Sequence, residues 1–377
     1  MTSKERMLTA ASFQEPDRVP IELVIGAPAR ELPEAQKIVE FIDTHADNFL
    51  GVPAANWGFF GLDSEYSEEI IEDIPDEFRR IKRTHRTEGG DFYAITKHNY
   101  PHLDAADYHW ERRFITNLEE LERLADAPRS PRPIFPEKHH AAVQKMGGRG
   151  VPFMGIAHPL GHLVRQATME EVYIWLFNEE GVVHRFLQNT CDQICATIRN
   201  LGEAGVTGWF GTVAHEMLIP PWMGHKQFDK VVFPYDKAVN DEVHRIGGMM
   251  RSHCHGNCMD FLEKMCDMGV DATEPLEPPP FGDVDLAEAK RQVGDRMMLS
   301  GNVPSQDFVF MTREEVREWV RKTIAEAAPG GGFALRTTGG HAGVNPTLDK
   351  PQLHKIIENV EVYMEAGLEF GEYPIKA

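Results

Sequence analysis

After about residue 150 the chain repeats one unit: an amphipathic helix, a short turn containing glycine, and a short apolar run. The turns read EAG-V at 203–206, DMG-V at 267–270 and EAG-L at 365–368. Strands that alternate with helices form parallel sheets, because each helix returns the chain to the starting edge. About half a dozen such units favour a closed (β/α)8 TIM barrel, since barrels of this kind often exceed 250 residues. A doubly wound sheet is the alternative, but no GxGxxG follows the first strand.

Local signals place several of these elements. The Thr168–Glu171 and Thr312–Glu315 segments have the spacing of a capping box, so each predicts the start of a helix. An apolar stripe from Val183 to Leu201 predicts a long helix. The expected strands are short apolar runs at 151–157, 206–214, 247–252, 270–274, 296–300 and 333–338.

The N-terminal part, about 1–150, is less regular. Residues Val19 to Ile25 predict a first barrel strand, and alternating residues around Gly89-Gly90 predict a hairpin. The proline-rich segment 126–138 is typical of a connector. We therefore expect one barrel domain over 1–377, with the N-terminal part elaborating it.

Charge and apolar runs exclude several classes of partner. The chain has 39 basic and 59 acidic residues, a formal net charge of −20, which repels nucleic acid and anionic lipid. No apolar run approaches the roughly 18 residues of a membrane span, and the N-terminus lacks the apolar stretch of a signal peptide. The five cysteines are few for a chain of this length and odd in number, which argues against a disulfide framework. We expect a cytoplasmic protein that acts on a small molecule, with no nucleic-acid or membrane partner.

Histidines gather where the expected strands end. In a (β/α)8 barrel the functional groups lie at the C-terminal ends of the strands. Four of the five strand ends considered carry histidine, and Glu216 stands beside one of them; the strand-end residues are His158, His215, His253, His255, Asn302 and His341.

Three of these histidines form a candidate metal site. His253 and His255 are two residues apart, so in an extended strand both side chains point to the same side. His341 would reach the same ion from another strand end. Three imidazoles leave a coordination position open for substrate, as in catalytic sites. Glu216 is then a fourth ligand or a general base, while His158, His215 and Asn302 are expected to bind substrate.

A plainer interpretation competes with this one. With 17 histidines in the chain, a single histidine at a loop end is more often a hydrogen-bonding loop residue than a metal ligand. Cys254 lies between the two histidines and should face the opposite way, into the packing. No P-loop, nucleophile elbow or HExxH motif offers another site.

Three stretches resemble the uroporphyrinogen decarboxylase superfamily: DRVPIE at 17–22, RGVPFMGIAHPLGHLVRQATMEEV at 149–172, and DVDLAEAKRQVGDRMMLSGNV at 283–303. Its corrinoid-dependent methyltransferases carry a His-x-Cys-Gly-Asn motif and a later Gly-Cys, whose residues bind zinc. This chain is similar, with His253-Cys254-His255-Gly256-Asn257 and Gly340-His341, so both family cysteines are replaced by histidine. Decarboxylases of the family have an arginine-rich segment after the first strand. Here 22–35 contains only Arg30, which disfavours porphyrinogen decarboxylation.

The resemblance implies a divalent transition metal, with zinc the first choice, and a corrinoid on a partner protein. The predicted function is metal-dependent methyl transfer between a small methylated substrate and a corrinoid or thiol acceptor. The alternative is a metal-dependent hydrolase or lyase, including a decarboxylase, that uses the same site. A non-catalytic binding protein on a decayed barrel is the third hypothesis.

Overall fold

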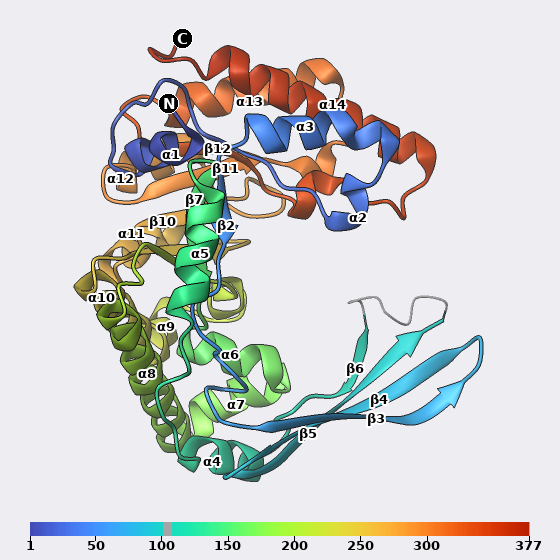
Figure 1. Ribbon diagram of the computed structural model, residues 1–377, viewed down its shortest axis with the longest axis vertical. Helices are drawn as coiled ribbons and strands as arrows, with labels where there is room; N and C mark the ends of the chain where they lie inside the picture. The colour runs from blue at the N-terminus through green and yellow to red at the C-terminus, as the bar shows by residue number, and fades with distance from the viewer. Residues whose placement is uncertain (101–107, 377) are drawn as a thin grey trace.

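The computed structural model describes residues 1–100 and 108–376, and a curled parallel sheet forms its centre (Figure 1). The strands of this sheet are β1 (Ile21–Glu22), β2 (Asn48–Gly51), β7 (Gly150–Gly155), β8 (Trp209–Thr212), β9 (Met249–Cys254), β10 (Ala272–Pro275), β11 (Met298–Val303) and β12 (Phe333–Thr337). Their order is β1-β12-β11-β10-β9-β8-β7-β2, and each ladder between neighbours is parallel.

The two edge strands of this sheet approach each other and nearly close the barrel. The backbone N–H of Asp47 donates to the carbonyl of Ile21 at 2.7 Å. Next to it, the Asn48 side chain exchanges two hydrogen bonds with the backbone of Leu23, at 2.9 and 3.0 Å. The predicted (β/α)8 barrel is confirmed.

Helices connect the strands and cover the outside of the barrel. They are α1 (Ser3–Ala11), α2 (Ala27–Arg30), α3 (Gln36–Thr44), α4 (Leu118–Asp126), α5 (Pro136–Met146), α6 (Pro159–Gln166), α7 (Met169–Asn178), α8 (Glu180–Glu203), α9 (His225–Val231), α10 (Phe233–Arg245), α11 (Leu262–Asp267), α12 (Leu286–Val293), α13 (Arg313–Ala327) and α14 (Lys350–Phe370). Short 3-10 turns lie between them: η1 (Pro33–Ala35), η2 (His215–Leu218), η3 (Met259–Phe261), η4 (Ser305–Asp307) and η5 (Gly340–Gly343). Helix α1 packs Met7 and Ala10 against interior residues such as Trp209 and Met298, and so closes the N-terminal end of the barrel.

Most helix predictions hold, and one local detail is wrong. Helix α8 covers the predicted Val183–Leu201 stripe, and α13 begins with the predicted capping box between Thr312 and Glu315. Helix α7 begins after Thr168 as expected, but the Thr168 side chain makes no capping hydrogen bond. The backbone of Thr168 is held instead by a hydrogen bond from its N–H to the carbonyl of Ile115.

A second, antiparallel sheet projects from the barrel between β2 and β7 (Figure 1). Its strands, in order, are β3 (Glu65–Ile74), β4 (Phe78–Thr87), β5 (Gly90–Asn99) and β6 (His109–Arg112). The predicted hairpin around Gly89-Gly90 joins β4 to β5, with Thr87 opposite Gly90. That the whole chain forms one domain stays a prediction. Among the helices of the described residues, none is long and apolar enough to cross a membrane.

Candidate functional site

Two histidine–carboxylate pairs lie at the C-terminal end of the barrel. Nδ1 of His253 lies 2.9 Å from Oε1 of Glu274, and Nδ1 of His255 lies 3.0 Å from Oε1 of Glu277. The two imidazoles approach edge to face, with ring centroids 4.6 Å apart. In both pairs the carboxylate contacts Nδ1, so Nε2 is the nitrogen left to a ligand. This is the arrangement in which a carboxylate fixes the orientation and tautomer of a metal-binding histidine.

Glu277 is held firmly enough to orient its histidine. It is 5% exposed and accepts hydrogen bonds from the Gly256 N–H at 2.8 Å and the Gln306 amide at 3.0 Å. Burial acts to raise the pKa of Glu277, but the hydrogen bonds from His255 and Gly256 outweigh it, so the pKa lies below its ordinary value. In return the hydrogen bond to Glu277 raises the pKa of His255, against the effect of burial.

Glu274 belongs to a buried ion network inside the barrel. Arg251 and Arg336 both contact the Glu22 carboxylate, at 2.7 and 2.8 Å, and Nε of Arg336 lies 2.9 Å from Glu274. Burial opposes ionisation of Glu274, yet Arg336, Arg251 and His253 together hold its pKa below the ordinary range. The network therefore gives His253 an ionised partner on a rigid support.

Glu216 faces this group from the next strand end. It is the second residue of the turn η2 after β8, and its charge contributes to the raised pKa of His255. Its Oε2 atom is buried and has no hydrogen-bond partner among the described residues. An unpartnered buried carboxylate oxygen whose charge reaches His255 is a candidate ligand for a cation.

His341 lies at the same end of the barrel but apart from the histidine pair. It is exposed in η5 after β12, with a left-handed backbone (φ 52°), and its ring packs near Gly26 after β1. The expectation that His253, Asn302 and His341 share one end of the barrel is confirmed, because β9, β11 and β12 are parallel. However, the ligand atoms of the three expected ligands, His253, His255 and His341, do not all lie within 4.8 Å of one another.

The triplet that meets this distance is His158, His215 and Asp236. Nε2 of His215 lies 2.8 Å from Oδ2 of Asp236, and Nδ1 of His158 lies 3.3 Å from the same oxygen. Burial lowers the pKa of His215, whereas His158 and His215 overcome burial and lower the pKa of Asp236 to about 2. Both rings are 2% exposed and stack at 4.3 Å, between the barrel wall and α10. They were expected to line the substrate pocket, but here they present almost no surface to a substrate.

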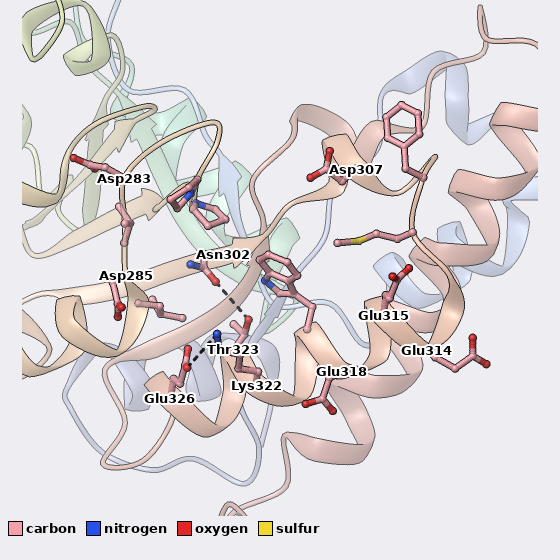
Figure 2. Close-up of a pocket in the computed structure, with 17 residues that line it drawn as sticks. Asp283, Asp285, Asn302, Asp307, Glu314, Glu315, Glu318, Lys322, Thr323 and Glu326 are labelled. Carbon is pink, nitrogen blue, oxygen red and sulfur yellow. Dashed lines mark hydrogen bonds and ion pairs between the residues drawn. The ribbon is translucent and has the colours of Figure 1, made fainter.

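Asn302 also points away from the pair of histidines. It is the penultimate residue of β11, and its Oδ1 accepts a hydrogen bond of 3.4 Å from Thr323 on α13 (Figure 2). Its side chain therefore lies at a groove on the outer face of the barrel. Its expected role in binding substrate at the mouth stays a prediction.

Glu274 and Glu277 were not among the residues predicted from the sequence. The signal was present, because Glu274 ends the expected strand 270–274 and Glu277 follows it, and strand ends are where barrel enzymes carry their functional groups.

The protein is a (β/α)8 barrel, and its candidate site is built from residues at the C-terminal ends of the strands. Residues 113–362 match the family Uroporphyrinogen decarboxylase (URO-D). The match covers more than half of the chain, so this chain belongs to the uroporphyrinogen decarboxylase family, as its motifs had indicated.

Two relatives illustrate the match. A uroporphyrinogen decarboxylase from Thioalkalivibrio sulfidiphilus (strain HL-EbGR7) is 32% identical over 100 residues, which is 26% of this chain and 26% of that protein. The chain thus spans about a quarter of the length of that curated relative. A solved structure of a methyltransferase from Methanosarcina mazei aligns with a TM-score of 0.56 over 98% of this chain and 99% of its own, at 16% identity. At that identity the likeness shows the shared fold.

Proposed function

We propose that this chain is a metal-dependent methyltransferase that acts at the C-terminal mouth of its barrel. It would move a methyl group between a small methylated substrate and a corrinoid, carried on a separate protein, or a thiol. The observation that carries the proposal is the pair of imidazoles at the end of β9, each fixed through Nδ1 by its own carboxylate. The methyltransferase likeness of the fold and the His-x-His-Gly-Asn sequence favour methyl transfer over other uses of such a site.

The residues at the mouth fit a divalent cation. His253 and His255 keep Nε2 available, and Glu216 has a buried oxygen without a partner in the described part of the chain. Glu274 and Glu277 contact the two histidines, and the charge of Glu216 also acts on His255. Arg251 and Arg336 contact Glu22 and Glu274 behind them. Carboxylates beside the two imidazoles favour a bound cation.

The ligand set we propose is His253, His255 and Glu216, with His341 as a further candidate. The ligand atoms of the first three residues do not all lie within 4.8 Å of one another, so binding of the ion would draw them together. A nitrogen and oxygen donor set of this kind suits zinc and other divalent transition metals. When bound, such an ion would supply Lewis acidity to the substrate heteroatom that loses or gains the methyl group.

The protein's own groups would orient the reactants and supply the proton that the substrate heteroatom takes up. In demethylation of the substrate, the carbon–heteroatom bond breaks, its electron pair stays on the heteroatom, and the acceptor nucleophile forms the new bond to the methyl carbon. The heteroatom then takes a proton. If Glu216 is not a ligand, it is the carboxyl group placed to hold that proton; Glu274 and Glu277 are engaged by arginine and by backbone and amide N–H groups.

The test is methyl transfer to free cob(I)alamin, followed by the cob(I)alamin absorbance. Metal-loaded protein would be supplied with a panel of methyl ethers, methylamines and thioethers, and a thiol acceptor would be tried in parallel. Turnover should require both a methyl donor and an acceptor, and Glu216→Gln should slow it by about 10²–10⁴-fold if Glu216 transfers the proton. Cleavage of a substrate with water as the only co-reactant would instead establish the hydrolase or lyase alternative.

A further inference from the structure

A groove with a volume of about 980 Å³ runs along the outer face of the barrel between α12 and α13 (Figure 2). Its apolar lining includes Trp319, Met311 and Phe310, and Phe310 is 81% exposed. Seven carboxylates and one amine also line it: Asp283, Asp285, Asp307, Glu314, Glu315, Glu318, Glu326 and Lys322. We propose that this groove docks a segment of a partner protein in which lysine or arginine alternates with large apolar residues. The proposal does not depend on the proposed function.

The charge of the groove selects a cationic occupant. Lys322, its single amine, lies 3.7 Å from Glu326, and Glu318 pairs with Arg321. Among the described residues, Asp307 and Glu314 have no ion-pair or side-chain hydrogen-bond partner. Figure 2 shows carboxylates on both sides of the groove, so an occupant would meet negative charge on each flank. A second copy of this chain, with its net charge of −20, is a poor electrostatic match.

The length of the groove favours a peptide segment over a small cation. The lining residues of α13 run from Glu314 to Glu326, which is about 18 Å of helix at 1.5 Å per residue. About five or six residues of extended chain, or a short helix, span that distance. A single amine or guanidinium would engage only a small part of it.

A hydrogen-bond donor on a largely buried residue points to the same kind of occupant. Asn302 is 5% exposed and lines the groove, and its Oδ1 is occupied by Thr323. Its amide nitrogen has no acceptor among the residues that the structure describes. A carbonyl oxygen of a peptide backbone would satisfy this nitrogen, while a polyamine has no acceptor to offer. The Asn302 amide, the apolar side chains and the carboxylates of the groove together match a peptide that carries basic and apolar residues.

Two loops connect the groove to the mouth of the barrel. Pro278 and Pro279 line the groove directly after Glu277, and Asp307 lines it directly after Gln306. Gln306 and Glu277 are hydrogen-bonded to each other at 3.0 Å. A partner docked in the groove would therefore sit beside the loops that hold His255 in place.

Binding to the full-length protein would be measured by fluorescence anisotropy with a fluorescein-labelled helical peptide of lysine and leucine. Matched probes replace lysine by glutamate, or leucine by serine. The test variants are Glu314→Lys with Glu318→Lys, and separately Phe310→Ser, all at exposed positions. The control is Glu137→Lys with Glu203→Lys, two exposed residues on α5 and α8, which flank β7 on the opposite side of the barrel from β11.

The charge reversal in the groove should weaken binding of the lysine–leucine peptide by about tenfold or more, and Phe310→Ser by about threefold. The control variant should bind within about twofold of the wild type, and circular dichroism should be unchanged in all of them. Equal weakening by the control variant, or equal binding of the lysine–serine peptide, would overturn the proposal, because the acidic surface in general would then be the binder. If micromolar spermine displaced the peptide, the groove would be a binding site for small cations and the proposal of a peptide partner would be wrong.

Discussion

Replacement of Glu277 by glutamine should weaken metal binding although Glu277 is not a proposed ligand. The Glu277 carboxylate accepts from three donors: Nδ1 of His255 at 3.0 Å, the Gly256 N–H at 2.8 Å and the Gln306 amide at 3.0 Å. A glutamine has one oxygen acceptor, and its own amide group would face a donor. At least one donor loses its partner, and a neutral amide oxygen holds the His255 ring less firmly than the carboxylate does.

The expected loss follows from this geometry. Loss of a carboxylate that orients a metal-binding histidine costs about 10–100-fold in metal affinity. That factor corresponds to about 1.4–2.7 kcal/mol of binding free energy. Without metal, the free energy of unfolding should fall by about 1–3 kcal/mol, because a buried donor is left unsatisfied.

The assay is a zinc titration in competition with a chromophoric chelator, together with denaturant unfolding of the metal-free protein. Glu263→Gln, at an exposed glutamate of α11, is the matched control and should leave both quantities unchanged. Zinc affinity of Glu277→Gln within twofold of the wild type would refute the reasoning, since His255 would then need no carboxylate to hold it.

Two further predictions concern stability. A Cβ added at Gly161 would lie 1.9 Å from Nε2 of His158, so Gly161→Ala should lower the unfolding free energy by about 1–3 kcal/mol. Gly155→Ala is the control and should have little effect, because a Cβ there would meet nothing within 4 Å. Equal effects of the two changes would contradict the packing described. The hydrogen bond to Asp271 raises the pKa of His244, so this pair stabilises the protein fully below about pH 6.5 and loses its effect as the pH rises through the raised pKa. The His244 side chain is 37% exposed, so solvent screens the pair. In denaturant titrations, the stability difference between wild type and His244→Gln should shrink by only about 0.2–1 kcal/mol from pH 6 to pH 9. A difference that grows with pH would show that the pair does not raise the pKa of His244.

The barrel could be predicted from the sequence because its signals are local. Alternating helices and apolar runs give a parallel sheet, and the stripe from Val183 to Leu201 reproduces α8 closely. Strand ends were harder to locate. The run 296–300 was expected to end before Gly301, but β11 continues to Val303 because its last residues pair with β12. Pairing with a neighbouring strand is a tertiary effect that a single run of residues does not show.

The histidine pair could also be predicted, whereas the surroundings of the other site residues could not. His253 and His255 are two residues apart, and that spacing brought them together as expected. His158 and His215 follow strands too, but Asp236 binds both from α10, and nothing in their own segments indicates that partner. Glu274 and Glu277 could have been found by applying the strand-end rule to β10.

The central claim is that the pair His253 and His255 holds a metal through nitrogen, and X-ray absorption of the zinc-loaded protein tests it most directly. The account predicts a first shell of nitrogen and oxygen at about 2.0–2.1 Å, with imidazole scattering that disappears in the His253→Ala/His255→Ala double variant. A sulfur shell at about 2.3 Å would mean that cysteine, such as the buried Cys254 or Cys258, binds the metal. That result, or zinc retained unchanged by the double variant, would contradict the account.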